Sequence, residues 1–104
     1  MIEHSTIYNL KNEVDYQNGS VVSKVIQKQN SGNATIFAFD KGEFLSPHSA
    51  PFDATAVIID GSAEITIGEN VFNLQEMEFI KMPANVTHGL KATERFKMLL
   101  FMFK

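Results

Sequence analysis

The feature that most constrains the fold of this chain is a series of short apolar segments separated by turn-forming residues. Segments rich in β-branched and aromatic residues predict strands near residues 21–26, 35–39, 55–59, 63–67, 71–74, 78–82, 87–92 and 95–103. Turn-forming runs that contain Gly, Asn or Asp lie between many of them. No segment has the apolar spacing of an amphipathic helix. The pattern therefore predicts an all-β protein, either a sandwich or a closed barrel.

Length, charge and composition exclude several classes of function. A chain of 104 residues predicts one domain, spanning 1–104. The net charge of -3 and the scattered basic residues argue against a nucleic-acid partner. The absence of cysteine excludes disulfides and thiolate chemistry. The first ten residues lack the apolar core of a secretory signal, and no apolar run is long enough to span a bilayer. We expect a cytoplasmic protein without a membrane partner.

The C-terminal run Phe96–Phe103 is apolar on both of its faces. A strand in an isolated barrel should alternate between apolar and polar residues, so the second face needs a cover. A second subunit or the N-terminal segment would provide one, and so would a central position of the strand within the monomer. A homodimer is therefore expected from the first of these alternatives.

Two of the three histidines, His48 and His88, lie beside proline-containing turn signals. On strict alternation, His48 shares a strand face with Phe44, Ser46 and Ala50. A barrel brings strands that are distant in sequence against each other. We therefore expect the two imidazoles to meet in the lumen.

The surroundings of these histidines match two spaced motifs. Residues 42–61 follow the pattern G-x5-H-x-H-x3-E-x6-G in its first Gly, first His and last Gly, and residues 77–92 follow G-x5-P-x-G-x2-H-x3-N in its Pro and His. In both, the spacing holds without gaps. The chain thus resembles the cupin family. The resemblance implies a small cupin-type β-barrel, a jelly-roll-like double-sheet barrel.

The departures from the motifs bear on function. Cupins typically bind a divalent metal through four side chains, and the resemblance leaves only His48 and His88 in those positions. Ala50 replaces the second histidine and Ala54 replaces the glutamate. Catalytic metal sites normally use three protein ligands, so two imidazoles alone seldom hold one. The loss of two ligands also enlarges the cavity.

Two glycines of the second motif are replaced as well, by Met77 and Asn85. Asparagine tolerates a positive φ, so Asn85 can serve the turn without glycine. The last asparagine of the motif is Ala92.

Other ligands for a metal are conceivable. Asp53 is adjacent to the lost glutamate position, but alternation points it the other way, and a role in capping backbone N–H groups is the favoured interpretation. His4 would reach the barrel mouth only if the N-terminal segment folds back. Weaker candidates lie at the second motif: Gln75, Glu76 and Glu78.

Three functions remain open at this point. The first is a small-molecule binder, with or without a divalent metal (Zn, Fe, Mn or Ni) on His48 and His88. Its expected ligand-binding residues are Phe44, His48, Ala50, Phe52, Met82 and His88. The second is a metal-dependent enzyme of the oxygenase or isomerase class. The third is a dimeric scaffold with a vestigial site.

Overall fold

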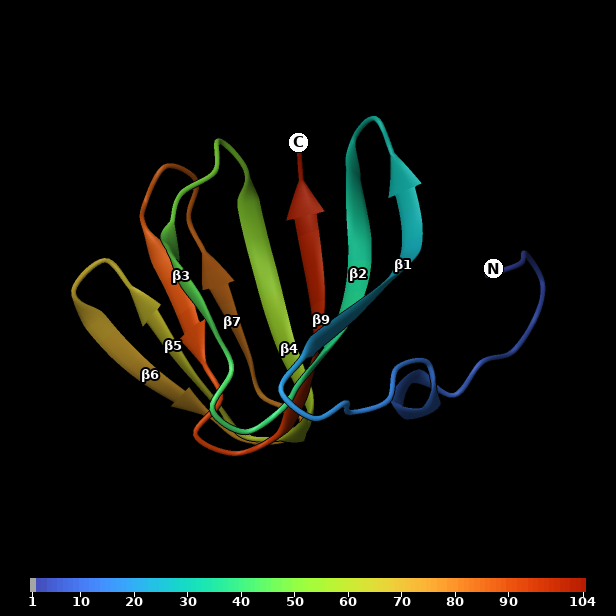
Figure 1. Ribbon diagram of the computed structural model, residues 1–104. Helices are drawn as coiled ribbons and strands as arrows, with labels where there is room; N and C mark the ends of the chain where they lie inside the picture. Colours follow the sequence, from blue (N-terminus) through green and yellow to red (C-terminus); the bar gives the residue numbers. More distant parts are fainter. Residues whose placement is uncertain (1) are drawn as a thin grey trace.

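The computed structural model describes residues 2–104 and confirms an all-β architecture of two antiparallel sheets. The two sheets face each other and converge at one end of the molecule, while the other end is open (Figure 1). The elements, in chain order, are the 3-10 turn η1 (Leu10–Asn12) and the strands β1 (Val21–Gln29), β2 (Gly32–Phe39), β3 (Phe44–His48), β4 (Asp53–Gly61), β5 (Ala63–Ile67), β6 (Asn70–Leu74), β7 (Phe79–Met82), β8 (His88–Lys91) and β9 (Phe96–Phe103). No helix in residues 2–104 is long and apolar enough to cross a membrane.

Each sheet joins strands that are distant in sequence. The five-stranded sheet has the order β1-β2-β9-β4-β7, and the four-stranded sheet has the order β3-β8-β5-β6. Strand β9 therefore lies between β2 and β4, the central position that the sequence leaves open as one alternative. The chain passes from one sheet to the other where β4 ends and β5 begins.

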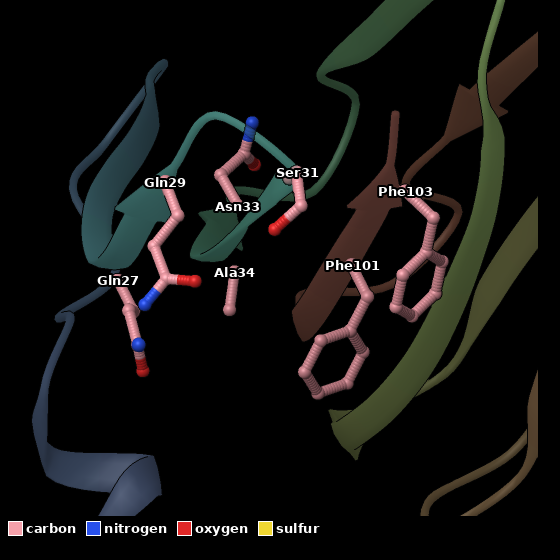
Figure 2. Close-up of a pocket in the computed structure, with 8 residues that line it drawn as sticks. Gln27, Gln29, Ser31, Asn33, Ala34, Phe101 and Phe103 are labelled. Atoms are coloured by element: carbon pink, nitrogen blue, oxygen red, sulfur yellow. The ribbon is translucent and has the colours of Figure 1, made fainter.

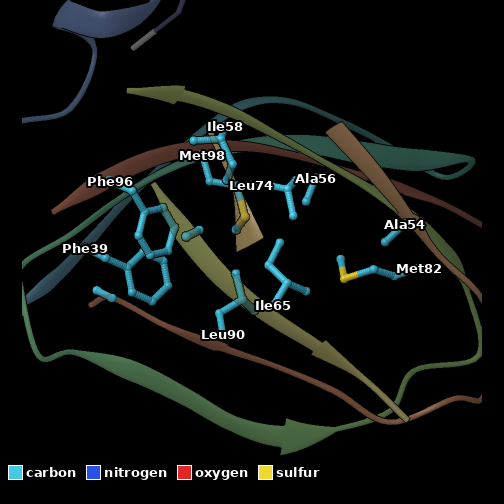
Figure 3. Close-up of a cluster of buried hydrophobic side chains, with 12 residues drawn as sticks. Phe39, Ala54, Ala56, Ile58, Ile65, Leu74, Met82, Leu90, Phe96 and Met98 are labelled. Atoms are coloured by element: carbon cyan, nitrogen blue, oxygen red, sulfur yellow. The ribbon is translucent and has the colours of Figure 1, made fainter. Parts of the chain in front are cut away.

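The space between the sheets holds the main core. Two aromatic rings, Phe39 on β2 and Phe96 on β9, stack with their centroids 4.5 Å apart. They lie at one side of the cluster, and Ala54 and Met82 lie at the other (Figure 3). Aliphatic side chains from both sheets fill the space between these ends. Burial of this apolar surface, rather than any polar contact, is what holds the two sheets together.

A second, smaller core lies on the outer face of the five-stranded sheet. There the strap, defined as residues 10–16, packs Leu10, Val14 and Tyr16 against a cluster that includes Ile36 and Leu99. The N-terminal segment thus covers part of the second apolar face of β9. One of the covers that the sequence predicts is therefore confirmed.

Polar contacts fix the position of the strap. The Tyr16 hydroxyl donates to Asp60 at 2.6 Å, and the Lys24 ammonium is 2.9 Å from a Glu13 carboxylate oxygen. Burial of the Tyr16 ring and its hydrogen bond to Asp60 raise the pKa of the phenol well above its usual range. The phenol therefore remains protonated and able to donate at any physiological pH.

Gly61, the last glycine of the first motif, lies where β4 approaches the start of β9. Its φ is +71°, and a Cβ placed on it would lie 1.9 Å from the Arg95 carbonyl oxygen. Any side chain there would force the two backbone segments apart. The motif glycine is therefore a packing requirement of the switch between sheets.

We predict that Gly61→Ala destabilises the protein more than Gly42→Ala, by at least about 1 kcal/mol in the free energy of unfolding. Gly42 is the matched control, because its φ of +89° is also unfavourable for alanine but its Cβ position is open. Urea unfolding of both variants measures the difference. Equal losses of stability would show that backbone strain alone, and not the Arg95 contact, accounts for Gly61.

The two replaced motif glycines keep a glycine-like backbone. Met77 has φ +69° and Asn85 has φ +65°, which confirms that Asn85 serves its turn in the left-handed conformation. Met77 belongs to the β6–β7 turn, where its N–H donates to the Ile58 carbonyl oxygen at 2.6 Å. A methionine in this conformation is strained.

We predict that Met77→Gly raises the free energy of unfolding by up to about 1 kcal/mol, because it relieves strain that exceeds the entropic cost of glycine. The methionine side chain is 73% exposed, so little burial is lost. Asn85→Gly is the control and should change stability less, since asparagine tolerates this conformation. A decrease in stability for Met77→Gly, measured by urea unfolding, would contradict the prediction.

Candidate functional site

The candidate site is formed where β3 pairs with β8 in the four-stranded sheet. In this pairing His48 lies opposite His88, and their ring centroids are 4.5 Å apart in an edge-to-face arrangement. His88 also pairs with Ile67 of β5, two residues from the inward-facing pair Ile65 and Leu90. Because side chains two residues apart on a strand share a face, the imidazoles face the interior at its open end. The two histidines meet as the sequence predicts.

The residues before His48 do not follow the alternation that the sequence suggests. Leu45 pairs with Leu90 and His48 with His88, so three steps along β3 match two along β8. This bulge at Ser46–Pro47 puts His48 on the same face as Leu45. Phe44 lies on the opposite face and is 63% exposed. Its predicted place beside the histidines in a ligand pocket is therefore corrected.

Each imidazole is oriented by the backbone carbonyl two residues before it. The Nδ1–H of His48 donates to the Ser46 carbonyl oxygen at 2.9 Å, and the Nδ1 of His88 is 3.4 Å from the Val86 carbonyl oxygen. A carbonyl oxygen only accepts, so these contacts place the proton of each neutral ring on Nδ1. Both Nε2 atoms then keep their lone pairs. The pair offers two acceptors at the barrel mouth.

Burial and the second imidazole lower the pKa of His88. Desolvation of its partly buried ring is the largest cause, the nearby His48 adds to it, and the Val86 carbonyl opposes it. The unfolded chain therefore binds a proton more readily than the folded one. Above the unfolded pKa of about 6.5, the ring is neutral in both states and its burial costs no stability through protonation. As the pH falls from there through the folded pKa, the unfolded chain takes up the proton first and the free energy of unfolding decreases.

On the facing five-stranded sheet, the inward positions at the same open end are apolar (Figure 1). Ala54 on β4 pairs with Met82 of β7 on one side and with Met102 of β9 on the other. All three pack in or against the main core. Met82 was expected from the sequence. The sequence does not predict Met102 as a lining residue, although the alternation of β9 places it on the same face as Phe96 and Met98.

The other predicted lining residues lie in the loop between β3 and β4. The Ala50 carbonyl oxygen accepts from the Asn85 N–H at 2.8 Å, which ties this loop to the turn before β8. Phe52 is half-buried, and the Lys104 ammonium lies 5.4 Å from its ring centroid. A groove of about 570 Å³ is lined by Met82 and its neighbours on β4 and β7, but neither histidine lines it.

The additional ligand candidates are engaged elsewhere. Asp53 accepts from the Ala84 N–H at 2.9 Å, so it bonds a backbone N–H as expected, although the partner lies 31 residues away and not in a local turn. Glu78 accepts from the Gln75 N–H at 2.7 Å, and Glu76 pairs with Lys11. His4 lies beside Ile26 and Gln27 of β1. Within residues 2–104, no three His, Asp or Glu side chains are grouped to hold a metal ion.

We predict that His48→Ala raises the pKa of His88, because it removes a like charge and opens the ring to water. An NMR titration of the His88 ring signals measures this change. His4→Ala is the matched control, since His4 lies at β1 rather than at the pair. If the pKa of His88 does not change in His48→Ala, the two rings are not neighbours in solution.

No protein-family model and no curated protein matches this chain, but solved structures do. A conserved protein of unknown function from Streptococcus pyogenes is 37% identical, with a TM-score of 0.93 over 99% of this chain and 90% of that one. A cupin 2 conserved barrel domain protein from Leptotrichia buccalis is 40% identical, with a TM-score of 0.91 over 93% of this chain. This chain covers 47% of the Leptotrichia chain, about half its length.

A cupin superfamily protein from Desulfitobacterium hafniense is 22% identical, with a TM-score of 0.91 over 98% of this chain and 94% of that one. At that identity the match shows the shared fold. The two sheets, the spaced motifs and the paired histidines agree with these likenesses. The chain belongs to the cupin superfamily, as a small barrel of the cupin 2 type.

Proposed function

We propose that this protein binds a small organic molecule at the barrel mouth, with His48 and His88 as polar anchors. The observation that carries the proposal is the hydrogen bonding of the two rings. Their Nδ1 atoms face the backbone carbonyls of Ser46 and Val86, so both Nε2 lone pairs are available to a ligand. Two acceptors on rings whose centroids are 4.5 Å apart can serve one bound group.

The chemistry of the pair favours a ligand that donates hydrogen bonds. Neutral Nε2 accepts, so a hydroxyl or an N–H group is a better partner than a carbonyl oxygen, which also accepts. The facing sheet presents Ala54, Met82 and Met102 at the same open end, and these side chains carry no charge and no strong donor. An apolar body with one hydroxyl or amine group matches this environment.

The residues present do not fit the usual metal centre of the family. Two of its four ligand positions are Ala50 and Ala54, and the neighbouring carboxylate of Asp53 is bonded to the Ala84 N–H. Two imidazoles are fewer ligands than catalytic sites normally use. This favours the organic ligand over a metal-dependent oxygenase or isomerase, and over a divalent cofactor (Zn, Fe, Mn or Ni) held by the two histidines.

We expect benzyl alcohol to bind more tightly than toluene or acetophenone, because only the alcohol donates to Nε2. NMR shift titrations of the wild type measure the three affinities. His48→Ala and His88→Ala should each weaken binding of the alcohol by roughly 2- to 12-fold, the value of one hydrogen bond. Binding of toluene should change less in these variants, and His4→Ala should change neither.

Two results would overturn this proposal. Equal affinities for the alcohol and toluene that neither variant changes would show that the histidines do not bind the ligand. This result would support the dimeric scaffold with a vestigial site. Elemental analysis after incubation with Zn, Fe, Mn and Ni tests the metal. Stoichiometric metal in the wild type that is lost in both histidine variants would instead establish a metal site.

A further inference from the structure

The chain enters β1 through a tight turn that contains its one Asn-Gly pair. Of the eight asparagines in the sequence, only Asn18 is followed by glycine. Across the turn, the Ser20 N–H donates to the Gln17 carbonyl oxygen at 3.1 Å. Gly19 has φ +66°, which glycine adopts without strain. Both Asn18 and Gly19 are exposed, so water reaches this peptide.

An asparagine that precedes glycine can react with its own backbone, and it is one of the thermolabile residues of proteins. The backbone nitrogen of Gly19 attacks Cγ of Asn18, and the new N–C bond closes a succinimide ring. The C–N bond of the side-chain amide breaks, and its nitrogen leaves as ammonia with the proton lost by Gly19. Water then opens the ring at either carbonyl carbon, which gives aspartate or isoaspartate. No reactant other than water is needed.

One ion pair holds both reacting groups of this turn. The Gly19 N–H donates to one oxygen of the Asp40 carboxylate at 2.8 Å, and Nε of Arg95 donates to the other oxygen at 2.7 Å. Nη2 of Arg95 also donates to Oδ1 of Asn18 at 3.3 Å. The Asp40 N–H donates to the Ser20 carbonyl oxygen at 3.1 Å, which fixes the carboxylate against the turn.

These two contacts act on the reaction in opposite directions. A cation at Oδ1 of Asn18 stabilises the negative charge that develops there during the attack. A carboxylate that accepts from an N–H stabilises the protonated nitrogen and disfavours its ionisation. The contact with Asp40 is shorter than the one with Oδ1, and the charge of Arg95 is shared with Asp40, so the restraining effect is the larger one.

The same contact keeps Asp40 in its charged form. The hydrogen bond from the Gly19 N–H is the largest cause that lowers the pKa of Asp40, and the hydrogen bond from Arg95 is the next. The carboxylate is therefore ionised, and able to hold the Gly19 nitrogen, throughout the physiological pH range.

We propose that Asn18 is a site of spontaneous deamidation, and that Asp40 restrains this reaction in the folded protein. While the turn is closed, the Gly19 nitrogen stays protonated and directed at the carboxylate. Local opening of the turn releases it for attack on Asn18. The rate of conversion is therefore set by the opening of one turn rather than by unfolding of the whole protein.

The product changes a contact of the strap. Conversion adds a carboxylate within reach of Arg95, whose guanidinium carbon lies 5.3 Å from the ring centroid of Tyr16 in the strap. Isoaspartate also adds a carbon to the backbone of the turn that joins the strap to β1. Asp40 and Arg95 directly adjoin Phe39 and Phe96 at the closed end of the barrel. The site is therefore independent of the ligand proposed for the open end.

Incubation of the folded protein at mildly alkaline pH, followed by peptide mapping with mass spectrometry, measures the conversion of Asn18. The folded wild type should convert more slowly than the same chain in urea. Asp40→Ala should raise the rate in the folded protein by roughly 2- to 12-fold, the value of one hydrogen bond. Glu94→Ala is the matched control and should leave the rate unchanged, because Glu94 is also a carboxylate beside Arg95 in sequence but pairs with Lys41.

A second asparagine in each sample separates loss of the restraint from unfolding. Asn30–Ser31 is an exposed pair in the β1–β2 hairpin, where Ser31 lines a groove of about 200 Å³ together with Phe101 and Phe103 (Figure 2). Loss of the Asp40 contact should accelerate conversion at Asn18 alone. Unfolding of Asp40→Ala would accelerate conversion at Asn30 as well, and circular dichroism checks the fold directly.

Three outcomes would overturn the proposal. Asn18 could convert as fast in the folded wild type as in urea, or in neither, which would remove the restraint or the site itself. Asp40→Ala could convert more slowly than the wild type, which would make Asp40 a base that promotes the reaction. Finally, Glu94→Ala could accelerate conversion as much as Asp40→Ala, which would exclude a specific role of the Gly19 contact.

Discussion

Strand β9 must bury apolar residues on both of its faces, and most of the structure follows from this requirement. Its inner face supplies Phe96 and Met98 to the core between the sheets. Its outer face needs a separate cover, which the strap provides as far as Leu99. A strand with two apolar faces is stable only in the middle of a sheet with material on both sides. The central position between β2 and β4 meets that condition.

The site depends on the same arrangement. The core closes one end of the barrel with the stacked rings of Phe39 and Phe96, and this leaves the opposite end for the paired histidines. There the four-stranded sheet contributes two imidazoles, whereas the five-stranded sheet contributes Ala54, Met82 and Met102. Polar groups thus come from one wall only. A ligand would be oriented from one side and held by contact with the other.

Periodicity and turn residues predict the fold class and most of the strands, because alternation and turn chemistry are local properties. The segment 63–67 matches β5 residue for residue. The meeting of His48 with His88 was also predictable, since it rests on the spacing of two motifs. The face occupied by Phe44 was not, because the bulge at Ser46–Pro47 shifts the alternation by one residue. Met102 was missed because its relation to Ala54 depends on pairing between distant strands.

The strap also determines the order in which the chain can assemble. Its docking surface includes Leu99, and the contact of Lys11 with Lys97 spans 86 residues of sequence. During synthesis the strap leaves the ribosome before β9, yet its binding surface is complete only after β9 has joined the sheet. Closing so long a loop is slow compared with pairing neighbouring strands. The strap is therefore made before the surface on which it docks, and the outer face of β9 stays uncovered until the barrel has formed.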